Sequence, residues 1–156
     1  MESKNSKNQN LPPIVHVEKI EDGFVWLVTI DNPPVNLLTS EVASLLHRAV
    51  TDFANDKKSK ALILAASGDR FFIGGGDINE ILNINSGADG MAVAKRGQVL
   101  CNLIESCEKP IIAAVTGPAV GGGNEIVIAC HLRIASERAY FQQSEVNLGI
   151  IPAFGG

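Results

Sequence analysis

The first hydrophobic runs of the chain predict a hairpin. Residues 15–20 and 24–30 are rich in β-branched and aromatic residues, and Glu21-Asp22-Gly23 between them is a favourable turn sequence. Asp31-Asn32-Pro33-Pro34 then ends the second run. We therefore expect two antiparallel strands at the start of the fold.

Four later runs predict further strands. Residues 111–115, Ile-Ile-Ala-Ala-Val, show no alternation with polar residues, as expected of a strand that is buried on both faces. Residues 61–65 form a similar short buried run, and residues 132–135 and 139–141 are shorter candidates. The strands are separated by segments with helical patterns, which indicates a largely parallel sheet with right-handed crossovers.

The helical segments differ in length. Thr39 or Ser40 can cap a helix with one apolar face. The positions of that face are Val42, Leu45, Leu46, Ala49 and Phe53. We expect a short helix over 77–82, a loop over 83–90 and a second long helix over 92–107. The inward positions of the second long helix would be Val93, Val99 or Leu100, Leu103 and Ile104.

Two glycine loops, Gly74-Gly75-Gly76 and Gly121-Gly122-Gly123, each follow a strand. The second loop leads into residues 126–129, which are apolar enough to be a buried helix. The first N–H groups of a helix have no partner within it and can hold negative charge, and in open α/β folds ligands bind beyond the carboxyl ends of the strands. Glu125 lies one turn further in. Alternatively, the glycines only permit a close crossing of helix on strand, and Glu125 complements the helix dipole.

Composition places the chain among globular proteins. It has 156 residues, 46% of them hydrophobic, a formal net charge of −4 and scattered basic residues, so it fits one domain and carries no nucleic-acid footprint. Its apolar runs are shorter than the roughly 18 residues that a membrane span needs. Cys101, Cys107 and Cys130 lack metal-ligand or disulfide spacing, so we expect reduced, buried thiols in a cytoplasmic protein. Residues 1–12 are expected to form a flexible tail, and 13–156 the domain.

Two loops of this kind can each direct one backbone N–H at a single oxygen. Such a pair is an oxyanion hole, in which one donor contributes about 2.7 to 4 kcal/mol at the transition state. Neither loop matches the dinucleotide or P-loop fingerprints, and no serine nucleophile elbow is present.

The motifs, taken together and in order, resemble the enoyl-CoA hydratase/isomerase, or crotonase, family. They are Phe72-Ile73-Gly74-Gly75-Gly76-Asp77-Ile78-x-Glu80, Thr116-Gly117-Pro118-Ala119-Val120-Gly121-Gly122-Gly123-Asn124-Glu125 and Phe141-x-x-x-Glu145-Val146-x-Leu148-Gly149-Ile150-Ile151-Pro152. The resemblance implies an α/β fold of the crotonase-like (ClpP/crotonase) type, a spiral of ββα units. We expect only its N-terminal core, truncated at the C-terminus, without the C-terminal helices of the family.

The resemblance also implies roles for individual residues. Gly76 and Gly122 would be the oxyanion-hole donors, and Glu125 and Glu145 the two catalytic carboxylates of a hydratase. Substrate would bind along Gly75, Gly76, Asp77, Ile78, Gly121 and Gly122. Two carboxylates suit hydration of a double bond conjugated to a thioester, since water must be deprotonated and a proton delivered to the α-carbon.

The implied substrate is an acyl-CoA or carrier-bound enoyl thioester. No cofactor beyond the coenzyme A of the substrate, no metal, no nucleic acid and no membrane are expected, and the family assembles as homotrimers or dimers of trimers when its C-terminal part is present. Alternatives are an enoyl-CoA isomerase or decarboxylase of the same family, and a non-catalytic acyl-CoA-binding module. The chain departs from the common pattern at Gly76, Asn124, His131 and Ala153, and we interpret His131 as structural.

Overall fold

The computed structural model describes residues 14–156 and contains a five-stranded sheet with the order β1-β2-β3-β4-β6. Its strands are β1 (Val15–Ile20), β2 (Val25–Ile30), β3 (Ala61–Ala66), β4 (Ile111–Val115) and β6 (Leu132–Ala135). β1 and β2 are antiparallel and every other neighbouring pair is parallel, so the predicted hairpin and the predicted parallel sheet are confirmed. The predicted N-terminal tail lies outside the described residues.

The hairpin turn is a short 3-10 segment, η1 (Glu21–Gly23). The Phe24 N–H closes this turn by donating to the Glu21 carbonyl at 3.0 Å, so β2 begins at Val25, one residue later than predicted. Along β2 the side chains of Trp26, Val28 and Ile30 are buried. This alternation places one face of the hairpin against the helices.

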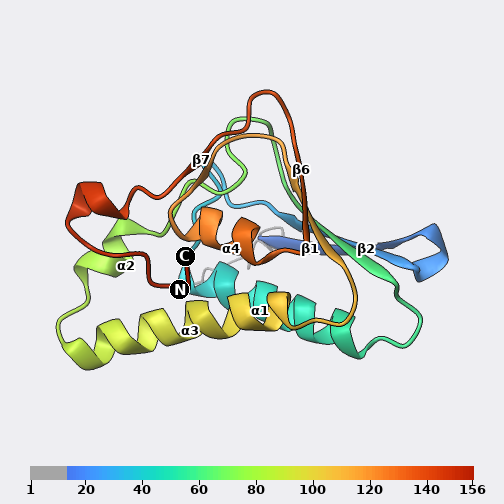
Figure 1. The fold of residues 1–156 in the computed structure, drawn as a ribbon, viewed down its shortest axis with the longest axis horizontal. Coiled ribbons are helices and arrows are strands. Elements are labelled where there is room, and N and C mark those ends of the chain that lie inside the picture. Colours follow the sequence, from blue (N-terminus) through green and yellow to red (C-terminus); the bar gives the residue numbers. More distant parts are fainter. Residues whose placement is uncertain (1–13) are drawn as a thin grey trace, which may run out of the picture.

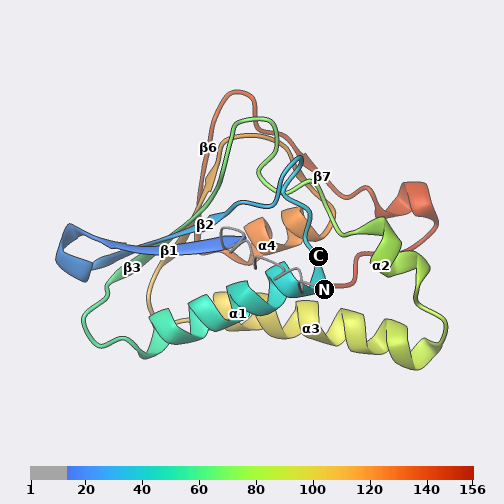
Figure 2. The same ribbon diagram turned by 180° about the vertical axis from the view of Figure 1, so that it is seen from behind.

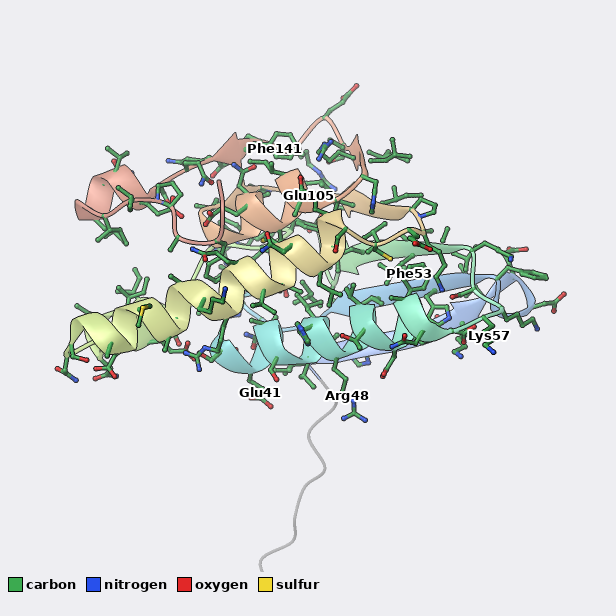
Figure 3. The ribbon with its side chains drawn as sticks, turned by 60° about the horizontal axis from the view of Figure 1, so that its bottom comes forward. Glu41, Arg48, Phe53, Lys57, Glu105 and Phe141 are labelled. Carbon is green, nitrogen blue, oxygen red and sulfur yellow. The ribbon has the colours of Figure 1, made fainter. Side chains whose placement is uncertain are left out.

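Two long helices cover one face of the sheet (Figures 1 and 2). They are α1 (Ser40–Asn55) and α3 (Gly87–Glu105). Thr39 caps α1, because its Oγ1 accepts a hydrogen bond from the Val42 N–H at 3.1 Å. Phe53 of α1 is fully buried and packs edge-on against Trp26, whereas Glu41 and Arg48 lie on the outer side of the helix (Figure 3).

The second long helix begins earlier than the sequence pattern predicted. The Ser86 side chain accepts a hydrogen bond from the Asp89 N–H at 3.1 Å and donates to the Asp89 carboxylate, so α3 starts at Gly87. The predicted loop over 83–90 is therefore wrong in its second half, because a local N-cap outweighs two unfavourable helical glycines. The helix ends at Glu105, and Leu100 rather than Val99 faces the core.

Short elements gather at the carboxyl ends of the parallel strands. They are α2 (Ile78–Leu82), α4 (Gly122–Ala129), η2 (Glu145–Leu148) and a two-stranded sheet of β5 (Ala119–Val120) and β7 (Phe141–Gln142). In both ribbon views the red C-terminal segment turns beside α2 and returns toward α4 (Figures 1 and 2). The helix predicted over residues 126–129, which is part of α4, is only partly buried, since Ile128 is 54% exposed. β7 begins two residues later than expected.

All three cysteines are buried free thiols, as predicted. Burial raises the pKa of Cys101 to about 12, with a smaller contribution from the nearby Glu125 carboxylate, and burial likewise raises the pKa of Cys130 to about 12.

Among the helices of residues 14–156, none combines the length and the apolar character required to cross a bilayer.

The Cys101 and Cys130 thiols will resist modification in the folded protein. Because their raised pKa lowers the thiolate population at pH 8 by roughly a thousandfold, a disulfide reagent will react with Cys101 and Cys130 much more slowly before unfolding than after it. As the pH rises from 9 toward 12, the unfolded thiols ionise first and folding stability falls. Mass spectrometry of timed reactions measures the labelling rates before and after unfolding. Rapid labelling of both thiols in the folded chain would contradict the prediction.

Candidate functional site

A cavity of about 170 Å³ lies where the glycine loops, the two long helices and the C-terminal segment meet. Its wall is mainly apolar. The apolar lining side chains include Leu38, Ala43, Ile81, Ile84, Val93, Ala94, Ile150, Ile151 and Phe154. Four polar groups singled out in the sequence reach the same cavity, since Gly76, Gly122, Glu125 and Glu145 all line it.

The first glycine loop is held by main-chain hydrogen bonds on one side. The Gly74 N–H donates to the Val35 carbonyl at 2.9 Å, and the Leu38 N–H donates to the Gly75 carbonyl at 2.8 Å. Gly75 has a φ of +106°, which few residues other than glycine adopt. Within residues 14–156 the Gly76 N–H donates to no protein group, and Gly76 lines the cavity.

The second glycine loop begins α4. Gly121 is the N-cap residue, with a φ of +53°, and its N–H donates to the Gln142 carbonyl at 2.7 Å. Gly122 is the first helical residue, so its N–H has no partner within the helix, and it has none elsewhere in the described part of the chain. This second amide therefore remains available at the same cavity.

The two loops are joined to each other through Ile73. Ile73 forms an isolated parallel bridge with Ala119, and its carbonyl accepts from the Val120 N–H at 2.9 Å. A Cβ on Gly123 would lie only 2.6 Å from the Ile73 Cβ and 2.8 Å from the Ile73 carbonyl oxygen. Main-chain pairing and this close contact therefore fix the position of one glycine loop relative to the other.

Glu125 is a buried carboxylate with an exposed fraction of only 3%. Its Oε1 accepts hydrogen bonds from the N–H groups of Phe154 and Gly156, each at 2.8 Å. Both donors act on the same oxygen, so they fix its position. The C-terminal segment thus orients this side chain at the cavity wall.

Glu145 reaches the cavity from the start of η2. Its Oε1 lies 3.0 Å from the point that a Cβ on Gly121 would occupy, so glycine at 121 leaves room for the carboxyl group. Its Oε2 is buried and has no hydrogen-bond partner in the described part of the chain. A buried carboxyl oxygen without a partner is costly, and such a group commonly serves a ligand, a water or a proton transfer.

The remaining residues expected to bind substrate divide into two groups. Asp77 lines the cavity and also caps α2, since its Oδ1 accepts from the Asn79 N–H at 2.8 Å. Gly75, Ile78 and Gly121 flank lining residues without lining the cavity themselves. Away from the site, His131 Nδ1 accepts from the Ile111 N–H at 3.1 Å, which supports its interpretation as structural.

Sequence reasoning missed two contacts that shape the cavity. The Phe154 ring packs directly over Gly97 of α3, where an added Cβ would lie 1.9 Å from the ring. The Glu80 carboxylate accepts from the Ser40 N–H and from Ser40 Oγ, the latter at 2.7 Å, and so ties α2 to the start of α1. Ser40 lies in a first helical turn, where an N–H lacks a partner within the helix, and this was a signal for the contact with Glu80. Nothing local in the sequence indicated the packing of Phe154 on Gly97.

This arrangement can stabilise negative charge on one oxygen of a ligand while two carboxyl groups exchange protons with it. The amide donors come from rigid main-chain segments, and the apolar wall keeps their hydrogen bonds away from water. A ligand with a polarisable carbonyl next to an apolar chain fits such a cavity.

Comparison with known proteins supplies independent findings. A family model described as Enoyl-CoA hydratase/isomerase matches residues 21–156. A probable enoyl-CoA hydratase of Bacillus subtilis is 44% identical over 86% of this chain and 52% of its own length. A short-chain-enoyl-CoA hydratase of Clostridium acetobutylicum is 40% identical over 87% of this chain and 52% of its own length.

Comparison with solved structures shows that the chain shares the fold of this family. The crystal structure of an enoyl-CoA hydratase from Bacillus anthracis has a TM-score of 0.85 and 26% identity, covering 92% of this chain and 55% of that one. The present chain thus spans about half the length of the relatives that it matches.

Proposed function

This chain belongs to the enoyl-CoA hydratase/isomerase family, and we propose that it carries the site at which such an enzyme adds water across the double bond of an enoyl thioester. The single observation that carries the proposal is the convergence of two unpaired glycine amides and two carboxyl groups on one apolar cavity. The crotonase fold of the chain is the framework that brings these groups together.

In the proposed reaction the thioester oxygen accepts hydrogen bonds from the Gly76 and Gly122 N–H groups. Attack of water on the β-carbon moves an electron pair through the conjugated system onto this oxygen, so the two donors stabilise the enolate as it forms. Neither amide has a competing acceptor in residues 14–156, and therefore no protein hydrogen bond must break before substrate binds.

The two carboxyl groups take different parts because their surroundings differ. Glu125, which already accepts from two N–H groups, is suited to act as the base that removes a proton from water. Glu145, whose Oε2 lacks a donor, is suited to deliver a proton to the α-carbon. The product gains OH at the β-carbon and H at the α-carbon, and proton exchange with solvent restores both groups.

The proposed substrate is a CoA or carrier-bound enoyl thioester. Relatives of this chain are named enoyl-CoA hydratases, and the apolar lining, which includes Ile81, Val93 and Ile150, suits an acyl chain. The proposal extends to assembly into trimers or pairs of trimers.

Hydration of crotonyl-CoA tests the proposal. The purified protein should remove the absorbance of the conjugated thioester and produce a species heavier by one water, as followed by spectrophotometry and mass spectrometry. Calorimetry with crotonyl-CoA on the same sample separates binding from turnover. Tight binding with no turnover on a panel of enoyl thioesters would show a non-catalytic binding module and contradict the hydratase proposal.

A further inference from the structure

Asn124 is a buried polar residue that the proposed reaction does not use. It lies in the first turn of α4, beside Glu125 in sequence, and is 7% exposed. Its Nδ2 donates a hydrogen bond to Gln143 Oε1 at 2.9 Å. Gln143 lies between β7 and η2, two residues before Glu145, so this bond joins the segments that carry the two carboxyl groups.

The other end of the Gln143 side chain lies near Glu125. Gln143 Nε2 lies 2.9 Å from the point that a Cβ on Gly156 would occupy, and Glu125 Oε1 lies 3.0 Å from the same point. Nε2 is buried and has no hydrogen-bond partner in the described part of the chain. An unpaired amide donor is thus held on the side of a buried carboxylate.

The bond to Asn124 decides which end of the Gln143 amide faces Glu125. A primary amide has an acceptor end and a donor end, and a rotation of 180° about its last bond exchanges them. In its observed orientation Asn124 presents its NH₂ group, which can only donate, so it takes the Gln143 oxygen as its neighbour. Reversing Gln143 alone would place two NH₂ groups against each other. Reversing both amides would restore their hydrogen bond but turn the Gln143 oxygen toward the Glu125 carboxylate, which is unfavourable.

We propose that Asn124 is a positioning residue, which holds Gln143 with Nε2 directed at Glu125 and thereby keeps Glu125 in place as the base. The inference rests on the proposed function, to which it adds a residue that touches neither water nor substrate. The N–H groups of Phe154 and Gly156 hold Glu125 Oε1 from one side. The oriented Gln143 amide supplies a further donor when the carboxylate shifts during proton transfer.

A double-mutant cycle tests this role. Asn124→Leu removes the donor and keeps the branching of the side chain, and Gln143→Met removes the amide through which Asn124 is proposed to act. Asn124→Leu should lower kcat for hydration about tenfold, the effect of losing roughly one hydrogen bond in the transition state, with KM unchanged within about twofold. In the Gln143→Met background the same substitution should lower kcat no further.

Asn102→Leu is the matched control, because Asn102 is exposed on the neighbouring helix α3, and it should leave kcat unchanged. Melting temperatures of all variants separate loss of folding from loss of positioning. Multiplicative effects of Asn124→Leu and Gln143→Met on kcat, or an Asn124→Leu variant that melts earlier with unchanged kcat, would overturn the proposal and leave Asn124 with a packing role only.

An NMR measurement on the unliganded protein is independent of turnover. A cross-peak between the Gln143 side-chain amide protons and the Glu125 Hγ protons is expected in the wild type and should be lost or weakened in Asn124→Leu. If the wild type hydrates no thioester, the proposed function fails while this cross-peak still reports on Asn124. A cross-peak that is equally strong in both proteins would overturn the positioning role.

Discussion

Glu125→Gln and Glu145→Gln will each lower kcat for hydration by about 10²- to 10⁴-fold, because each removes one proton-transfer group from the reaction. Glutamine keeps the shape of the side chain and retains an oxygen that can accept from the Phe154 and Gly156 N–H groups. The Glu125 variant should therefore remain folded. Its loss of activity would report on chemistry and not on the collapse of the cavity.

The measurement is steady-state hydration of crotonyl-CoA by each variant, with calorimetric binding of the same thioester alongside it. KM and the binding constant should change far less than kcat. Glu41→Gln is the control, since Glu41 lies on the outer side of α1 (Figure 3), and it should behave as the wild type.

The pattern across the two variants also distinguishes reactions within the family. Moving a double bond needs one carboxyl group, so an isomerase would lose activity mainly in Glu145→Gln and retain it in Glu125→Gln. Full hydratase activity in either variant would contradict the two-carboxyl mechanism. Losses of similar size in both variants would support it.

Gly123→Ala will destabilise the fold by about 3 kcal/mol, at the upper end of the usual cost of overpacking. The added Cβ would lie 2.6 Å from the Ile73 Cβ and 2.8 Å from the Ile73 carbonyl oxygen, and a backbone atom cannot rotate away as a side-chain tip can. The helix that carries Gly122 and Glu125 would have to move from the first glycine loop. We therefore expect activity to fall together with stability.

Gly87→Ala is the matched control for this substitution. Gly87 also lies in the first turn of a helix, no atom lies within 4 Å of its added Cβ, and alanine there should be neutral or stabilise by about 0.4 to 1 kcal/mol. Urea unfolding of both variants gives the two free energies of unfolding. A Gly123→Ala variant as stable as Gly87→Ala would show that the contact between the loops relaxes without cost.

The parts of the fold that follow from local pattern were predictable. The hairpin, α1 with its Thr39 cap and the buried strand β4 each depend on residues close together in sequence, and the sequence reasoning placed them within one residue. The start of α3 was misplaced because the Asn, Ser and Gly content of residues 83–90 indicated a loop, whereas in the structure Ser86 caps a helix there.

The candidate site was predictable in its residues but not in its supports. The order of strand, glycine loop and helix, together with the family resemblance, pointed to Gly76, Gly122, Glu125 and Glu145, and all four line one cavity. The donors that hold Glu125 come from a segment 29 or more residues away in sequence. Neither periodicity nor a turn signal encodes such a contact between a side chain and a remote main chain.

The pairing of Ile73 with Ala119 and Val120 fixes the two glycine loops relative to each other without help from the apolar side chains that line the cavity. Ile81, Val93 and Ile150 can therefore be exchanged for smaller or larger apolar residues while the amides keep their spacing. Under the proposed function, chain-length preference and reactivity are then separately adjustable, so selection or engineering could retune the preferred thioester in a few steps without rebuilding the reactive centre.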